Sequence, residues 1–100
     1  MYDMNNLKKL AKFAELAPEA WKAFVAFDEA VVKGGAIPLK YKELMAVAVA
    51  LTTQCPYCIE VHTKKAKEAG ASEAELAEVT MVSAALRAGA AVVHGTHCLE

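Results

Sequence analysis

The chain has 100 residues, of which 56% are apolar and 23% charged, and its formal net charge is −1. This length supplies one modest hydrophobic core, so we expect a single domain that spans residues 1–100. The small net charge gives no electrostatic reason to expect nucleic acid or an anionic membrane as a partner. Because the apolar share is high while the charged share is ordinary, we expect some apolar surface to be buried between subunits.

The amino end has neither the basic nor the apolar segment of a secretory signal. The longest unbroken apolar run, Leu44 to Leu51, is far shorter than the ~20 residues that span a bilayer. We therefore expect a soluble, cytoplasmic protein. Three cysteines are an odd number, which argues against a disulfide scaffold, and in a reducing compartment a Cys-x-x-Cys pair is more often catalytic or metal-binding than structural.

Helical periodicity organises the first third of the chain. Residues 6–16 place apolar side chains at the i, i+3, i+4, i+7 positions of an amphipathic helix. Pro18 suits the first turn of a second helix, which we expect to run to about Val32 and to end at Gly34-Gly35. Trp21 and the aromatic residues near it would suit either a ligand pocket or a core, and their helical spacing favours the core.

A third helix is expected over residues 39–53, following Pro38. Residues 44–51 are apolar on every side of that helix, and a helix of this kind must be surrounded. In so small a domain, the surrounding surface is expected to come from a neighbouring subunit.

Two further helices complete the predicted fold. The fourth begins near Pro56, with the Cys-x-x-Cys pair at its amino end, and stops at Ala69-Gly70. Ser72 and Glu75 have the spacing of a capping box for a fifth helix, which runs to about His94. No segment shows the alternation of a strand, so the sequence predicts an all-α fold of about five helices.

Two thiols and an imidazole share one face of the fourth helix. Cys55 and Cys58 are three residues apart, and Cys58 and His62 are four apart, which are the spacings of helical neighbours. The two cysteines could therefore close a disulfide with little backbone movement, and the His62 ring could meet the Cys58 sulfur. We interpret this group as a thiol-based redox site.

Two effects on thiolate formation favour different cysteines as the nucleophile. The helix amino terminus favours the thiolate, above all at Cys55. His62 can accept the proton of Cys58 and then stabilise its thiolate as an ion pair. We favour Cys58, because Cys55 lies nearly two turns from the imidazole.

A zinc site is the main alternative for the same residues. Its remaining ligands would come from the carboxyl end, where the sequence offers His94, His97 and Cys98. We interpret that end instead as a poorly ordered tail with ordinary polar residues. Our preferred interpretation therefore has no metal ligands.

Glu43 is the last charge before the apolar stretch of the third helix. From the pattern alone it is a solvated or helix-dipole carboxylate in the first turn.

Lys42-Glu43-Leu44 followed by Cys55-Pro56-Tyr57-Cys58, His62 and Gly70-Ala71 resembles the carboxymuconolactone decarboxylase / AhpD-like superfamily. The resemblance extends from about Trp21 to Val93. It implies an all-helical fold that assembles as a trimer or hexamer, and alkylhydroperoxidase chemistry. It also implies that Cys58 attacks the peroxide, that Cys55 resolves the product as a disulfide, and that His62 and Glu43 form a proton relay.

The resemblance departs from the best-characterised AhpD proteins at one position. They carry a second histidine between the two cysteines, where this chain has Tyr57, which we treat as an auxiliary residue. The difference predicts a low peroxidase efficiency.

The resulting hypothesis is an antioxidant, peroxiredoxin-type oxidoreductase. It needs a hydroperoxide substrate and a dithiol reductant, a dihydrolipoyl or thioredoxin-like protein by analogy. No cofactor motif is visible, so the cysteines would carry the electrons themselves. The rivals are a lactone decarboxylase of the same superfamily, a metal-binding or redox-sensing module without turnover, and a disulfide reductase that acts on proteins.

Overall fold

The computed structural model describes residues 2–100, whose regular secondary structure is entirely helical and includes no strand. The α-helices are α1 (Ala11–Leu16), α2 (Pro18–Val32), α3 (Leu39–Thr53), α4 (Pro56–Glu68) and α5 (Glu73–His94), and 3₁₀ segments occupy Met4–Leu10 and Gly95–Cys98. The predicted all-α fold of about five helices is confirmed.

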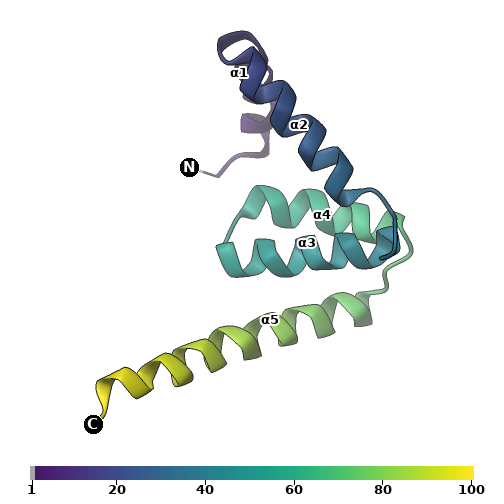
Figure 1. Cartoon of the computed structure of the whole chain (residues 1–100). Helices are drawn as coiled ribbons and strands as arrows, with labels where there is room; N and C mark the ends of the chain where they lie inside the picture. Colours follow the sequence, from purple (N-terminus) through teal and green to yellow (C-terminus); the bar gives the residue numbers. More distant parts are fainter. Residues whose placement is uncertain (1) are drawn as a thin grey trace.

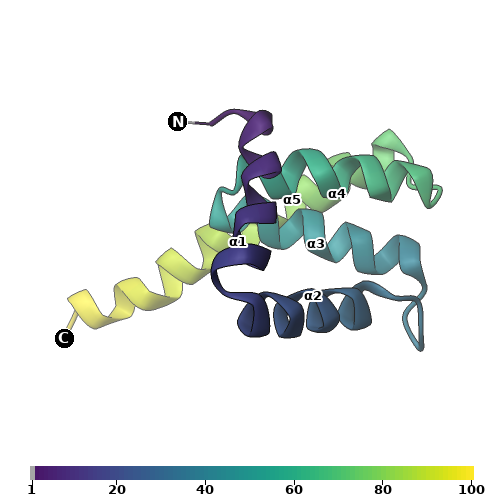
Figure 2. The ribbon, with the colours of Figure 1, turned by 90° about the horizontal axis from the view of Figure 1, so that it is seen from above.

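The centre of the molecule is an antiparallel pair formed by α3 and α4. The two helices run side by side in Figures 1 and 2, and the first part of α5 packs against α3 from the other side. Gln54 makes the reversal between α3 and α4, because its left-handed backbone (φ 57°) ends α3 and turns the chain. This hairpin places the amino end of α4, and with it the two cysteines, directly after α3.

Local signals set the helix boundaries as expected. Pro18 and Pro56 occupy the first turns of α2 and α4, where a missing N–H costs nothing. Ser72 and Glu75 form the predicted capping box at the start of α5, with hydrogen bonds of 3.1 and 2.9 Å. Gly70 follows α4 with φ 98°, a conformation that residues with a Cβ rarely adopt.

The buried core is small and lies along α3. Leu44, Val47 and Ala50 follow one another at three-residue spacing and face α4 and α5, where Ala66 and Ser83 are also buried. The other sides of α3 are open, since Met45 and Val49 remain 51% and 60% exposed. One chain therefore covers only part of a helix that is apolar all round.

The amino-terminal helix differs from the prediction. Residues 6–16 do not form one amphipathic α-helix but a 3₁₀ segment (Met4–Leu10) followed by the short α1. The apolar side chains of Leu10, Phe13 and Leu16 are all exposed, so little burial stabilises a continuous helix. Short helices without such packing are marginal.

The expectation that Trp21 and its neighbours pack in a core is wrong for the single chain. No residue of α2 is buried, although the Trp21 ring stacks on that of Phe13 and contacts the tilted ring of Phe24, with centroids 5.8 and 5.6 Å away. The reason is the path of α2, which leaves the α3–α4 pair and meets α3 only sparsely (Figures 1 and 2).

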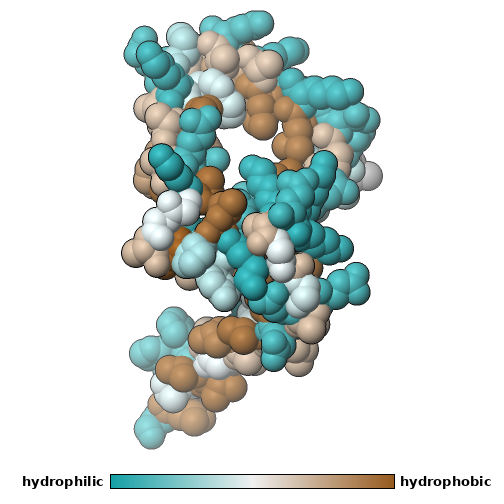
Figure 3. Space-filling view, turned by 90° about the vertical axis from the view of Figure 1, so that its right-hand side faces the viewer, coloured by the Kyte–Doolittle hydropathy of each residue, from teal (hydrophilic) through white to brown (hydrophobic). Residues whose placement is uncertain are grey.

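The chain is extended for its length. Its radius of gyration is 16.6 Å, whereas a compact domain of this size has about 13 Å. Figure 3 shows several patches of apolar side chains among hydrophilic ones, and an opening between two parts of the molecule. Large exposed apolar residues lie on every major helix except α4, and they include Phe27, Val49, Met81, Leu86 and Val92.

One helix has the length and composition of a membrane span. Residues Glu73–Cys98 have a mean hydropathy of 1.5 over the most apolar window, and only 6% of that window is buried. A single helix of this kind is weak support for a span, because helices that pack inside soluble proteins share the same composition.

Candidate functional site

Cys55 and Cys58 lie at the junction of α3 and α4. Their Sγ atoms are 2.6 Å apart and are not joined in a disulfide, whose S–S bond is about 2.05 Å long. Cys55 is also the residue that caps α4, because its Sγ accepts the backbone N–H of Cys58 at 3.3 Å. The sequence places a sulfur where serine or aspartate commonly caps a helix.

The two thiols titrate as a pair with opposite shifts. The hydrogen bond from the Cys58 side chain, and then the N–H of Cys58, lower the pKa of Cys55 below its ordinary value. The hydrogen bond to Cys55 and burial raise the pKa of Cys58 to about 11. The first negative charge on the pair therefore resides on Cys55, as the capping position favours, and Cys58 retains its proton longer.

Glu43 is not a solvated carboxylate. It is 2% exposed, and its Oε2 lies 2.6 Å from Nδ1 of His62 on the neighbouring helix. The pairing of α3 with α4 makes this contact between residues that are 19 positions apart in the sequence. A carboxylate at Nδ1 orients the imidazole and leaves Nε2 as the ring nitrogen that can exchange a proton with the site.

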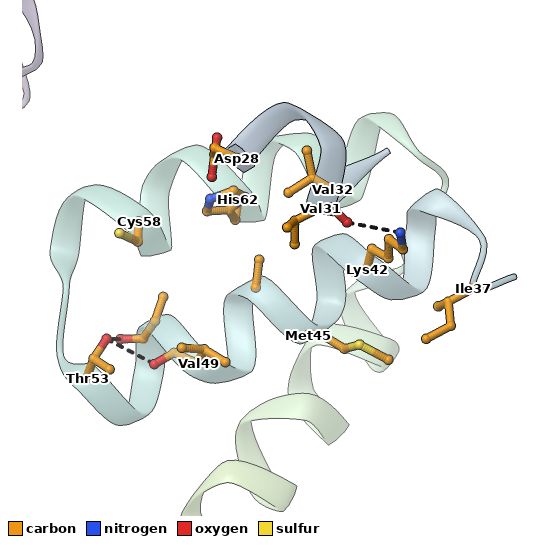
Figure 4. A pocket seen from close by; sticks show the side chains of 12 residues that line it. Asp28, Val31, Val32, Ile37, Lys42, Met45, Val49, Thr53, Cys58 and His62 are labelled. Atoms are coloured by element: carbon orange, nitrogen blue, oxygen red, sulfur yellow. Dashed lines mark hydrogen bonds between the residues drawn. The ribbon is translucent and has the colours of Figure 1, made fainter. Parts of the chain in front are cut away.

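A cavity of about 430 Å³ opens beside these groups. Cys58 and His62 lie along one side of it and Val49 and Met45 along the other, as Figure 4 shows. Its remaining wall is formed largely by apolar residues of α2, α3 and the segment that joins them, namely Val31, Val32, Ile37, Ala46 and Ala50. Cys55 is not one of the lining residues, so a small molecule in the cavity meets Cys58.

Two charged residues of this cavity were not predicted from the sequence. Asp28 of α2 lines it together with Cys58 and His62, and Lys42 of α3 lines its other end (Figure 4). The signal for Asp28 was present, because it stands on the apolar face of α2, four residues after Phe24 and three before Val31. An acidic residue within an apolar stripe requires an explanation.

Tyr57 points its hydroxyl to the amino-terminal segment. The hydroxyl oxygen accepts a hydrogen bond from Nδ2 of Asn6 at 2.9 Å and one from the backbone N–H of Asp3 at 3.3 Å. The ring of Tyr2 contacts that of Tyr57 edge-on, with centroids 5.1 Å apart. Tyr57 thus anchors the start of the chain onto α4.

The zinc alternative requires a cluster of ligand side chains. No group of three or more histidine, cysteine or acidic side chains in residues 2–100 is arranged to hold a metal. His94, His97 and Cys98 lie at the far end of α5 and the 3₁₀ turn after it, away from α4 (Figure 1). The expected frayed tail is instead helical as far as Cys98.

Fold and site together define an all-helical protein that carries a dithiol and a carboxylate–imidazole pair at a helix hairpin. Residues 18–100 match the carboxymuconolactone decarboxylase family, and the chain belongs to that family. The resemblance inferred from the sequence is thereby confirmed at the level of the superfamily.

Two solved structures share the fold. A carboxymuconolactone decarboxylase family protein from Legionella pneumophila, lpg0406 in its apo form, is 34% identical with a TM-score of 0.76, over 82% of this chain and 73% of that one. A protein from Methanobacterium thermoautotrophicum is 36% identical with a TM-score of 0.82, over 90% of this chain and 98% of that one.

The sequence relatives carry names that state no activity. "Uncharacterized protein 4 in cox locus" of Paracoccus denitrificans is 46% identical over 77 residues, which are 77% of this chain and 69% of the relative. An uncharacterized protein of Cupriavidus necator is 28% identical over 92 residues, which are 92% of this chain and 81% of the relative.

Proposed function

We propose that the protein is a thiol-dependent peroxidase that reduces organic hydroperoxides through Cys55 and Cys58. The observation that carries this proposal is the separation of 2.6 Å between two free sulfurs, beside a cavity that Cys58 lines. Such a pair can pass between dithiol and disulfide with very little movement. A lactone decarboxylase, which transfers protons without redox cycling, has no use for it.

In the first step, His62 removes the proton of Cys58, and the Cys58 thiolate attacks the O–O bond of the hydroperoxide. The sulfur gains a hydroxyl and becomes a sulfenic acid, while the alkoxide takes the proton from His62 and leaves as an alcohol. Glu43, bonded to Nδ1, stabilises the imidazolium between the two proton transfers. Because Cys58 has a raised pKa, its attack depends on this proton removal.

In the second step, Cys55 attacks the sulfenic sulfur of Cys58. The Cys55–Cys58 disulfide forms, and the hydroxyl leaves as water after gaining a proton. The lowered pKa of Cys55 suits this role, because the thiolate is the attacking form. A dithiol reductant, a dihydrolipoyl group or a thioredoxin-like protein, then exchanges with the disulfide and restores both thiols.

The site works only while an external reductant keeps the pair reduced. This requirement suits the cytoplasm, where thiols are maintained in the reduced state. We also infer that the active protein is a homo-oligomer, a trimer or hexamer as the resemblance implies, because α2 and α5 leave large apolar side chains uncovered. Residues 1–100 would then form one domain in each subunit.

The test is a thiol count before and after one equivalent of cumene hydroperoxide, in a Cys98→Ser background that removes the exposed third thiol. We expect two thiols to be lost and mass spectrometry to locate a Cys55–Cys58 disulfide. Cys55→Ser should instead accumulate a sulfenic acid at Cys58 that dimedone traps. The assignment is wrong if Cys58→Ser keeps full dithiol-dependent turnover, or if the purified protein binds stoichiometric zinc through both cysteines.

A further inference from the structure

Asp28 brings a carboxylate to the end of the cavity where the thiol lies. It stands on α2, lines the cavity together with Cys58 and His62, and lies beside them in Figure 4. Its charge also makes the smallest of the contributions that raise the pKa of Cys58, after the hydrogen bond to Cys55, burial and the charge of Cys55. No step of the proposed reaction uses this carboxylate.

The position of Asp28 depends on how α2 is held. Nζ of Lys42 donates hydrogen bonds to the carbonyl oxygens of Val31 and Lys33, at 2.9 and 2.6 Å, and so fixes the carboxyl end of α2 to α3. Cations are stabilised at helix carboxyl ends, where carbonyl groups lack partners. These two hydrogen bonds hold the ammonium group of Lys42 at the end of the cavity opposite Asp28 (Figure 4).

The charges that face the cavity are therefore unevenly distributed. At the thiol end Asp28 is negative, whereas the lysine among the lining residues, Lys42, lies at the other end (Figure 4). His62 already has a carboxylate partner in Glu43. The rest of the wall is mostly apolar, and an ionised substrate would lose its hydration there without gaining an opposite charge near the thiol.

We propose that Asp28 is a specificity-determining residue, which selects neutral hydroperoxides against those that carry a carboxylate. The inference rests on the proposed peroxidase function and names its substrate class. Specificity of this kind comes from repulsion of the wrong ligand rather than from extra attraction of the right one. An anionic substrate that reaches Cys58 must place its charge close to that of Asp28, whereas an uncharged one pays no such cost.

The test compares cumene hydroperoxide with its 4-carboxylate, whose charge lies across one aromatic ring from the peroxide. For the unsubstituted protein we expect kcat/KM to favour the neutral compound. Asp28→Asn should reduce that preference roughly three- to tenfold, the effect of one partly screened charge at this range. Asp28→Lys should reverse it. The ratio between the two substrates cancels any general change in thiol reactivity that follows the loss of the Asp28 charge.

Glu29→Gln is the matched control, since it removes the neighbouring charge on α2 from a residue that does not line the cavity. The corresponding alcohols supply a readout that needs no turnover, because calorimetry measures whether the neutral alcohol binds more tightly than its carboxylate. If neither hydroperoxide is reduced, the peroxidase function fails while this binding preference still decides the role of Asp28. An unchanged preference in Asp28→Asn and Asp28→Lys would overturn the inference.

Discussion

Oε2 of Glu43 lies 2.6 Å from Nδ1 of His62, and this contact joins the first turns of α3 to the middle of α4. The carboxylate is almost completely buried, and the imidazole is its hydrogen-bond partner across the helix pair. A buried carboxylate needs such a partner, so the contact stabilises the hairpin and orients the ring at the same time.

Glu43→Gln separates these two roles. The amide keeps the volume and can still accept a hydrogen bond, so we expect the free energy of unfolding to fall by only about 1–2 kcal/mol. Peroxide turnover should fall roughly a hundredfold, because a neutral group no longer stabilises the imidazolium. Denaturant titration and steady-state kinetics measure the two effects, with Glu68→Gln, an exposed carboxylate of α4, as the control. Turnover within a few-fold of normal would remove Glu43 from the relay.

The thiol pair predicts a distinctive pH dependence of alkylation. A lowered pKa means that the thiolate of Cys55 forms at a lower pH than that of an ordinary cysteine, whereas Cys58 ionises only near pH 11. In a Cys98→Ser background, iodoacetamide should therefore modify Cys55 first as the pH rises, and tandem mass spectrometry of the modified peptide identifies the site.

The Cys58 side chain is the largest cause of the Cys55 shift. Cys58→Ala should consequently move the alkylation profile of Cys55 to higher pH, and Cys58→Ser, which retains a hydroxyl donor, should move it less. Cys55→Ala should lower the pKa of Cys58 from about 11, and its alkylation profile should move to lower pH. If the alkylation profile of the remaining cysteine in each variant equals its profile in the protein with both cysteines, the sulfurs do not interact in solution.

Tyr57→Phe tests whether the tyrosine between the cysteines belongs to the relay. Its hydroxyl accepts hydrogen bonds from Asn6 and Asp3, so the variant should loosen the amino-terminal segment and leave peroxide turnover within about threefold of normal. Limited proteolysis reports the first effect and kinetics the second. Asn6→Ala is the matched control for the loosening, and a loss of turnover in Tyr57→Phe alone would place the hydroxyl in the chemistry.

The uncovered apolar surface predicts self-association. Light scattering should give three or six times the 10.7 kDa of one chain. Leu86 of α5 is 66% exposed in the single chain, and Leu86→Glu should shift the protein toward smaller species by introducing a charge into a contact between subunits. Asn5→Glu, the same change of charge at an exposed polar residue, should leave the mass unchanged. A monomer at micromolar concentration in the unsubstituted protein would contradict the prediction.

The sequence by itself determined the helices from Pro18 onward and the order of the chemistry-bearing residues. Pro18, Pro56 and the Ser72–Glu75 capping box set helix boundaries through local rules, which act within a few residues and need no tertiary partner. The spacing from Cys55 to Cys58 likewise brought two sulfurs together, because three residues make almost one helical turn.

Only the tertiary structure decided how those residues meet the rest of the chain. Glu43 looked solvated from its pattern, and the packing of α3 against α4 buried it beside His62. The hydrogen bond between the two sulfurs is the largest cause of the lowered pKa of Cys55, and the place of Asp28 followed from the path of α2. Contacts between distant segments depend on how helices cross, and periodicity along one helix carries no information about the helix that it will face.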